Sequence, residues 1–278
     1  MKTQLSELVS VLEEKEVRAP QDLTIGGLAL DSRETGEGTL FFALPGEKED
    51  GGDYIAEAKA RGAVCAVCEQ PPETEIPYIL VPDAHKALAL CAAVWYGTPA
   101  GKLTVVGVTG TNGKTTTTCL IKQLLERTKG AKVGLIGTNQ NLIGESAVPA
   151  ERTTPDALTL QRLLAQMVDA GCTYAVMEVS SHALMQKRVE GIRFRVGVFT
   201  NLTQDHLDYH GTMEAYCEAK ARLFDQCDIA CVNGDDKWTE RLLAHFAGKS
   251  VTFGQDMTND LVGWRARYEN DCVRFTAC

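Results

Sequence analysis

The chain has 278 residues, a formal net charge of −9 and a hydrophobic content of 44%. This length and composition allow a sizeable core and two domains, and the acidic balance excludes a nucleic-acid binder with a broad basic face. The ten cysteines are scattered through apolar or helical segments and the first residues lack the apolar run of a signal peptide, so we expect a reduced, cytoplasmic protein. The longest apolar stretch, residues 87–96, is too short to cross a bilayer, so no membrane partner is expected.

Residues 1–98 are predicted to form a small α/β domain. Apolar residues at helical spacing predict a first helix between Leu5 and Leu12. The other expected elements are strands over residues 28–33, 39–44 and 63–68, a helix ending near residue 60 and a helix over residues 83–96. Cys65 and Cys68 are interpreted as core thiols, because no second C-x-x-C pair accompanies them. Residues 97–101 form a candidate linker.

A glycine-rich loop between a predicted strand and a predicted helix is the most informative feature. The β-branched run over residues 103–108 ends at this loop, and the helix that follows is expected to end at Gly130. Glycines let backbone N–H groups turn toward an anion, the helix N-terminus adds a partial positive charge, and a lysine adds a full one. Thr115 is a candidate magnesium ligand. The candidate ATP-binding residues are Gly110, Thr111, Asn112, Gly113, Lys114, Thr115 and Thr116.

The spacing of this loop departs from the usual pattern, because Val108 stands where the first glycine is expected. A strand-to-helix turn that binds nothing is the alternative interpretation. The lysine, the threonine after it and the strand–loop–helix context all agree with phosphate binding, which we therefore favour.

The segment from residue 99 to residue 278 alternates strands and helices, which predicts a parallel sheet with helices on both faces. Strands are expected over residues 132–137, 175–179, 195–201 and 228–232, and residues 251–254 begin the last segment. Thr154 is expected to cap a helix, with Pro155 at its first position. Glu178 ends a buried strand, so it must be paired, protonated or bound to a cation, at the edge where open α/β sheets hold ligands. A structural arginine partner is the alternative to a metal.

Three histidines and one lysine follow in the same half of the chain. His182, His206 and His210 fall within thirty residues and two of them follow predicted strand ends, so their clustering favours metal or phosphate contact over separate structural roles. Lys220 falls within the apolar stripe of a helix expected over residues 212–226. Its amine either reaches water along the helix surface or is held near the anionic site.

Taken together, these motifs resemble the Mur ligase family, in particular its muramyl tripeptide synthetase branch. The similarity covers nearly the whole chain and is carried by residues 30–33, 110–116, 153–156, 178–182, 186–188, 201–211 and 216–224. It implies a uridine-binding N-terminal domain followed by a phosphate-loop ATPase domain. The implied activity is ATP-dependent amide formation in peptidoglycan precursor synthesis. The terminal carboxylate of UDP-MurNAc-L-Ala-D-Glu would become an acyl phosphate, which the amine of lysine or meso-diaminopimelate would attack.

The resemblance also implies roles for individual residues. Magnesium would be held by Thr115 and Glu178 at one site, and by Glu178, His206 and Lys220 at a second, with Lys220 converted to a carbamate by carbon dioxide. Lys114, Lys220 and His206 would be the catalytic residues. The implied substrate-binding residues are Leu30, Ser32, Thr153, Thr154, Ser180, Gln186 and Arg188. In the family the loop matching residues 45–49 lies close to the substrate.

Members of the family carry a further, C-terminal domain that supplies the amino-acid pocket, and no Asp-Asn-Pro-Arg-like motif is found here. We therefore expect a monomeric fragment of a longer protein that binds both nucleotides but ligates weakly or not at all by itself. Two alternatives stay open. A folylpolyglutamate-type ligase would have no use for the uridine-binding segment at residues 30–33. A non-catalytic nucleotide-binding module would release no phosphate in response to a UDP-muramyl peptide.

Overall fold

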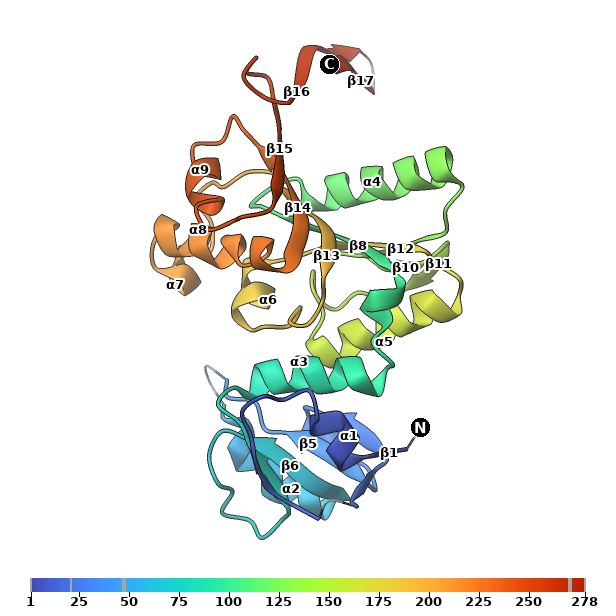
Figure 1. Ribbon diagram of the computed structural model, residues 1–278, viewed down its shortest axis with the longest axis vertical. Coiled ribbons are helices and arrows are strands. Elements are labelled where there is room, and N and C mark those ends of the chain that lie inside the picture. Colours follow the sequence, from blue (N-terminus) through green and yellow to red (C-terminus); the bar gives the residue numbers. More distant parts are fainter. Residues whose placement is uncertain (1, 21, 47–48, 270–271, 278) are drawn as a thin grey trace. The chain divides into compact units, whose positions relative to one another are not determined.

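The computed structural model describes residues 2–20, 22–46, 49–269 and 272–277. The chain forms two compact units (Figure 1). The first unit contains residues 1–99 together with residues 156–165 and 186–191, and the second contains the remaining segments. No sequence signal indicated that two later segments would join the first unit. The assignment of residues 1–98 as a domain for the UDP substrate stays a prediction.

The first unit is built on a five-stranded sheet in the order β2-β7-β6-β5-β4, in which only β2 is antiparallel to its neighbour. Its strands are β2 (Glu16–Arg18), β4 (Gly27–Ala29), β5 (Thr39–Phe42), β6 (Ala63–Cys68) and β7 (Tyr78–Leu80). The other elements are strands β1 (Thr3–Gln4) and β3 (Thr24–Ile25), helices α1 (Leu5–Val9), α2 (Ile55–Ala60) and α3 (Ala84–Trp95), and 3-10 turns η1 (Ser32–Glu34), η2 (Gly51–Tyr54) and η3 (Pro99–Lys102).

Local side-chain chemistry explains where the elements of this unit begin and end. The carboxylate of Asp83 accepts from the N–H of Lys86 and caps α3. Strand β6 spans the residues that were predicted for it. The strand predicted over residues 28–33 is shorter, because the carboxylate of Asp31 accepts from the N–H of Arg33 and starts the turn η1. The predicted first helix likewise ends early, at Val9.

Cys65 and Cys68 are free thiols buried in β6. Burial raises the pKa of Cys65 to about 12 and that of Cys68 to about 11. Their burial in β6 confirms the prediction that Cys65 and Cys68 are core residues.

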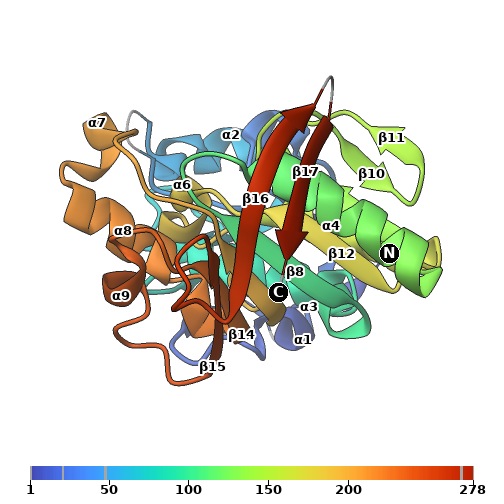
Figure 2. The same ribbon diagram turned by 90° about the horizontal axis from the view of Figure 1, so that it is seen from above.

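The second unit is organised by a ten-stranded sheet in the order β11-β10-β9-β12-β8-β13-β14-β15-β16-β17. The strands from β9 to β16 in this order are parallel, and antiparallel strands close both edges. Figure 2 shows β16 and β17 as a hairpin. The strands are β8 (Thr104–Thr109), β9 (Val133–Ile136), β10 (Asn141–Ile143), β11 (Ser146–Val148), β12 (Tyr174–Glu178), β13 (Phe194–Phe199), β14 (Cys227–Asn233), β15 (Lys249–Gly254), β16 (Leu261–Glu269) and β17 (Cys272–Ala277).

Helices connect these strands, as the alternation in the sequence predicted. They are α4 (Lys114–Lys129), α5 (Ala157–Asp169), α6 (Ser181–Met185), α7 (Leu207–His210), α8 (Met213–Ala221), α9 (Thr239–Leu242) and the 3-10 turn η4 (Phe224–Gln226). Gly130 ends α4 in a left-handed conformation, as expected. No helix among the described residues is long and apolar enough to cross a membrane.

The two faces of the second sheet are covered by different helices. On one face, Val106 and Val108 of β8 pack in a cluster that includes Ile121 of α4. On the other face, a Cβ added to Gly107 would lie 2.8 Å from the ring of Phe194 and 3.1 Å from Leu223, two residues beyond the end of α8. Helix α4 therefore covers one face and the α8 segment covers the other (Figure 1).

Two predictions of local structure in this unit are wrong. Thr154 does not cap α5, because its hydroxyl is engaged by the distant backbone groups of Glu178 and Ser180. The carboxylate of Asp156 accepts from the N–H of Thr159 in its place. The helix predicted over residues 212–226 ends at Ala221 and is followed by the separate turn η4. Both errors arise from contacts distant in the sequence, as described below.

Candidate active site

The glycine loop begins later than the usual phosphate-loop pattern would place it. Val108, at the position expected for the first glycine, is a buried strand residue that packs toward α4. Gly110 has a φ of +145°, and a Cβ added to it would lie 1.9 Å from Oγ1 of Thr200. Gly113 has a φ of +82° and precedes the first residue of α4. Glycine is therefore needed at position 110, where Thr200 lies close and φ is positive, and at position 113, where φ is positive. Position 108 needs no glycine, because the chain there is regular strand.

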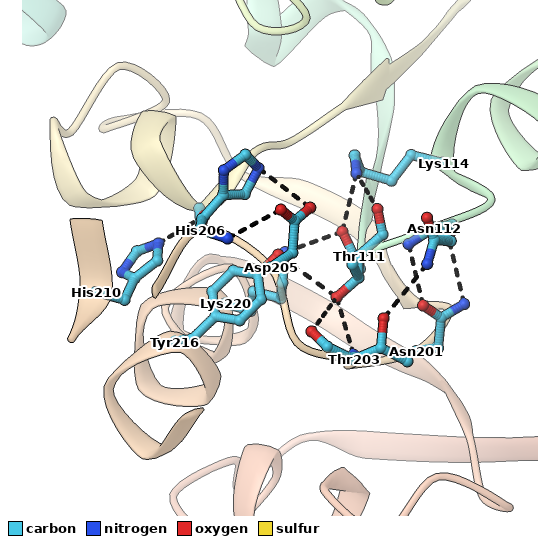
Figure 3. Close-up of polar contacts among 12 residues, drawn as sticks. Thr111, Asn112, Lys114, Asn201, Thr203, Asp205, His206, His210, Tyr216 and Lys220 are labelled. Carbon is cyan, nitrogen blue, oxygen red and sulfur yellow. Dashed lines mark hydrogen bonds and ion pairs between the residues drawn. The ribbon is translucent and has the colours of Figure 1, made fainter. Parts of the chain in front are cut away.

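The loop is held by the segment that follows β13 (Figure 3). The N–H of Thr111 donates to the carbonyl of Asn201 over 2.8 Å, and the N–H of Asn112 donates to Oδ1 of Asn201 over 3.0 Å. The N–H of Thr203 donates to Oγ1 of Thr111 over 3.0 Å. The N–H groups of Thr111 and Asn112 thus fix the loop, whereas those in the first turn of α4 have no acceptor within their own helix. Asn201 lies in one of the segments that carry the family resemblance, but it was not among the predicted site residues.

Two lysine amines converge on one carbonyl of the loop (Figure 3). Nζ of Lys114 donates to the carbonyl oxygens of Gly110 and Thr111, each over 2.9 Å. Nζ of Lys220, which comes from α8, donates to the same oxygen of Gly110 over 2.9 Å. The interpretation that Lys220 reaches water is excluded, because the residue is only 1% exposed and its amine lies 4.4 Å from the ring centroid of Tyr216.

Burial also changes the protonation of both amines. It lowers the pKa of Lys114, against the opposing charges of Glu178 and Asp205. Burial, together with the positive charge of Lys114, lowers the pKa of Lys220 to about 7. The direction of this shift favours the neutral form of the Lys220 amine.

Glu178 is 1% exposed at the end of β12, as its sequence context predicted. Its carboxylate accepts from the N–H of Thr138 over 2.9 Å and from the hydroxyl of Thr138 over 3.1 Å. These hydrogen bonds take the place of the arginine considered as an alternative partner. Glu178 and Thr115 line the same pocket beside α4, so two oxygen-bearing residues predicted to hold magnesium come together.

The three predicted histidines form one aromatic cluster. The ring centroid of His182 lies 5.0 Å from that of His206 and 5.7 Å from that of His210. Nε2 of His206 lies 3.4 Å from a carboxylate oxygen of Asp205 (Figure 3). Within the described residues no group of three His, Cys, Asp or Glu side chains is arranged to hold a metal ion.

The predicted substrate-binding residues fall in two groups. In the second unit the hydroxyl of Thr154 donates to the carbonyl of Glu178 and accepts from the N–H of Ser180. The hydroxyl groups of Thr153 and Thr138 are hydrogen-bonded over 3.0 Å.

In the first unit the hydroxyl of Ser32 donates to Glu57 over 2.8 Å, and Leu30 packs against the core. Arg188 and Gln186 also belong to the first unit and hydrogen-bond to each other. Part of the loop over residues 45–49, namely residues 47 and 48, lies outside the described residues.

The fold and site are those of an α/β nucleotide-binding protein. Its glycine loop follows a strand of a parallel sheet and contacts the buried amine of Lys220, and the buried acid Glu178 shares a pocket with Thr115. A family model described as "Mur ligase middle domain" matches residues 108–278, and another described as "Mur ligase family, catalytic domain" matches residues 24–96. The chain belongs to the Mur ligase family, which confirms the predicted family and α/β fold class.

Individual relatives agree with this assignment. The UDP-N-acetylmuramoyl-L-alanyl-D-glutamate--2,6-diaminopimelate ligase of Geobacillus kaustophilus is 45% identical over 263 residues, covering 91% of this chain and 54% of the relative. The ligase of the same description from Gloeobacter violaceus is 50% identical over 231 residues, covering 81% of this chain and 47% of the relative. The chain thus spans about half the length of the curated relatives it matches.

Solved structures show the same architecture. A structure titled UDP-N-acetylmuramoyl-L-alanyl-D-glutamate--2,6-diaminopimelate ligase matches with a TM-score of 0.84 and 29% identity, over 100% of this chain and 57% of that chain. MurF from Acinetobacter baumannii matches with a TM-score of 0.68 and 22% identity, over 100% of this chain and 58% of that chain, and so shares the fold.

Proposed function

We propose that this chain provides the UDP-substrate-binding and ATP-binding parts of an amide ligase that joins 2,6-diaminopimelate to UDP-MurNAc-L-Ala-D-Glu. The descriptions of the relatives support the substrates and favour diaminopimelate over lysine as the amino acid. The observation that carries the proposal is the convergence of Lys114 and Lys220 on the carbonyl of Gly110. A simple nucleotide-binding module would need Lys114 at its phosphate loop, but it would not need a second, buried lysine there.

The proposed reaction brings two anions together. A carboxylate oxygen of the dipeptide attacks the γ-phosphorus of ATP and ADP leaves, and the amine then displaces phosphate from the acyl phosphate. Lys114 and the first turn of α4 would neutralise charge on the transferring group. The protein would supply position and charge, with no covalent enzyme intermediate.

Magnesium fits the residues present. Thr115 and Glu178 share a pocket and offer the oxygen ligands that magnesium prefers, so we propose that they hold one ion. The ion would screen the negative charges of the nucleotide phosphates and the carboxylate. For a second ion we propose Glu178, His206 and a carbamate on Lys220 as ligands.

Carbamylation of Lys220 has a physical rationale. Two ammonium groups that share one buried carbonyl repel each other. Carbon dioxide reacts only with a neutral amine, and the burial of Lys220 favours that form. The carbamate would be an anion beside Lys114, so repulsion would become attraction, and its oxygen atoms could serve as magnesium ligands.

The remaining predicted residues are proposed to bind the UDP-muramyl substrate. Leu30 and Ser32 would contact its uridine end, and Thr153 and Thr154 its diphosphate and sugar. Ser180, Gln186 and Arg188 would meet its other polar and anionic parts. The predicted cytoplasmic location and monomeric state stay predictions.

A lysine substitution in the full-length protein tests the proposal. Lys220→Met should lower phosphate release in the presence of ATP, UDP-MurNAc-L-Ala-D-Glu and diaminopimelate by about a hundredfold or more, because it removes a charged group at the reacting centre. Lys132→Met is the matched control, since Nζ of Lys132 also donates to a backbone carbonyl, that of Ala170, but on the protein surface. The control should keep wild-type rates.

Two results would contradict the proposal. If the full-length wild-type protein binds ATP but releases no phosphate in response to the UDP-muramyl dipeptide, the nucleotide-binding module is the correct interpretation. Equal rates for the two lysine variants would contradict the role of Lys220.

A further inference from the structure

Thr109, the last residue of β8, has a buried hydroxyl with no hydrogen-bond partner. The residue is 0% exposed, and its Oγ1 is one of four such side-chain atoms among the described residues. Its main-chain carbonyl is satisfied, because it accepts from the N–H of Thr200 over 3.1 Å. A buried polar group without a partner costs free energy, so an orphaned hydroxyl beside a candidate site points to a missing partner.

The alternation of β8 shows which face of the sheet Thr109 occupies. Val106 and Val108 face α4, so Gly107 and Thr109 face the opposite side. Gly107 confirms this direction, because a Cβ added there would meet Leu223, which follows α8. Thr109 is therefore on the face covered by the segment that carries Lys220.

The buried amine of Lys220 contacts the residue next to Thr109. It crosses from α8 to the carbonyl of Gly110, the residue directly after Thr109. An ammonium offers only donors, so it presents no acceptor for a hydroxyl proton. A carbamate at this amine would offer two acceptor oxygens.

We propose that Thr109 is a positioning residue for a carbamate on Lys220, donating a hydrogen bond from its hydroxyl to one carbamate oxygen. The inference rests on the carbamylation proposed above. In that step the neutral amine attacks the carbon of carbon dioxide and a C–N bond forms. One C–O π bond becomes a lone pair on oxygen, and the proton lost from nitrogen goes to solvent. The hydroxyl thus gains a charge-assisted acceptor.

Two variants of the full-length protein test this role. Thr109→Val keeps the branched shape without the hydroxyl, and Thr109→Ser keeps the hydroxyl. With ¹³C-labelled bicarbonate, NMR should show a carbamate signal that Lys220→Met removes. Thr109→Val should need about tenfold more carbon dioxide for half occupancy, as expected for a lost hydrogen bond to a charged group, and Thr109→Ser should stay within about threefold of wild type.

Thermal unfolding separates this role from simple packing. Without carbon dioxide Thr109→Val should unfold at the wild-type temperature or higher, because it removes an unsatisfied hydroxyl. Bicarbonate should then raise the unfolding temperature of the wild type more than that of Thr109→Val, because ligands that bind only the folded state stabilise it. A Thr109→Val variant carbamylated with wild-type affinity would overturn the role of Thr109 and leave the proposed carbamate intact. A wild-type protein without any Lys220-dependent signal would overturn both.

Discussion

The burial of the Lys220 amine was only partly predictable from the sequence. Its place in an apolar helical stripe showed that it was unusual, but periodicity alone allowed either a solvent-exposed or a buried amine. The outcome depends on a tertiary contact with Gly110, more than a hundred positions earlier in the chain. Glu178 was more predictable, because a carboxylate at the end of a buried strand needs polar partners wherever it lies. The identity of its partner, Thr138, depends on how neighbouring strands end.

A prediction for pH dependence concerns His210. Burial, together with the charges of His182, Lys220 and His206, lowers its pKa to about 4, against the opposing charge of Asp208, from the ordinary value of 6.5. Between these two values the unfolded chain binds a proton that the folded chain does not. The stability contributed by neutral His210 is therefore complete above pH 6.5 and is lost as the pH falls toward 4.

Urea unfolding of the wild type and of His210→Gln at several pH values checks this prediction. The wild-type midpoint should fall more steeply than that of the variant between pH 6.5 and pH 4. Parallel curves in this window would show that His210 does not titrate differently in the folded protein.

Helix and strand boundaries were predicted correctly where neighbouring residues determine them. Strand β6 and helices α3 and α4 were predicted within a residue or two, because strand composition, the cap at Asp83 and the stop at Gly130 are all local signals. Helix α8 ends at Ala221, earlier than predicted, and Leu223 and Phe224 are buried against Gly107 and Gly197. That packing is invisible to helical periodicity.

Thr154 shows the same limitation and leads to a prediction about stability. Its hydroxyl links the carbonyl of Glu178 to the N–H of Ser180 instead of capping α5. Thr154→Val should lower the free energy of unfolding by about 1–3 kcal/mol, because it leaves buried backbone groups without partners. Thr154→Ser keeps the hydroxyl and should cost clearly less. Chemical denaturation compares the two variants, and equal losses would indicate that shape, not hydrogen bonding, matters at this position.

For the fold of the chain, the alternation of strands and helices correctly predicted the parallel sheet of the second unit. That ligands bind at the carboxyl edge of this sheet stays a prediction. The attachment of residues 156–165 and 186–191 to the first unit was not predictable, because it depends on packing between distant segments. Asn201 was missed as a site residue for a similar reason. Its amide side chain and carbonyl hold the loop at Thr111 and Asn112, and nothing in its own sequence neighbourhood indicates this.

In the reaction proposed for the full-length protein, the substrate carboxylate becomes an acyl phosphate before the amide forms. The full-length protein should be given ATP, diaminopimelate and UDP-MurNAc-L-Ala-D-Glu labelled with ¹⁸O in the terminal carboxylate of its D-glutamate. Mass spectrometry of the released phosphate then tests the claim directly. Each amide formed should transfer one labelled carboxylate oxygen to the released phosphate. Amide formation with unlabelled phosphate would rule out the acyl-phosphate intermediate.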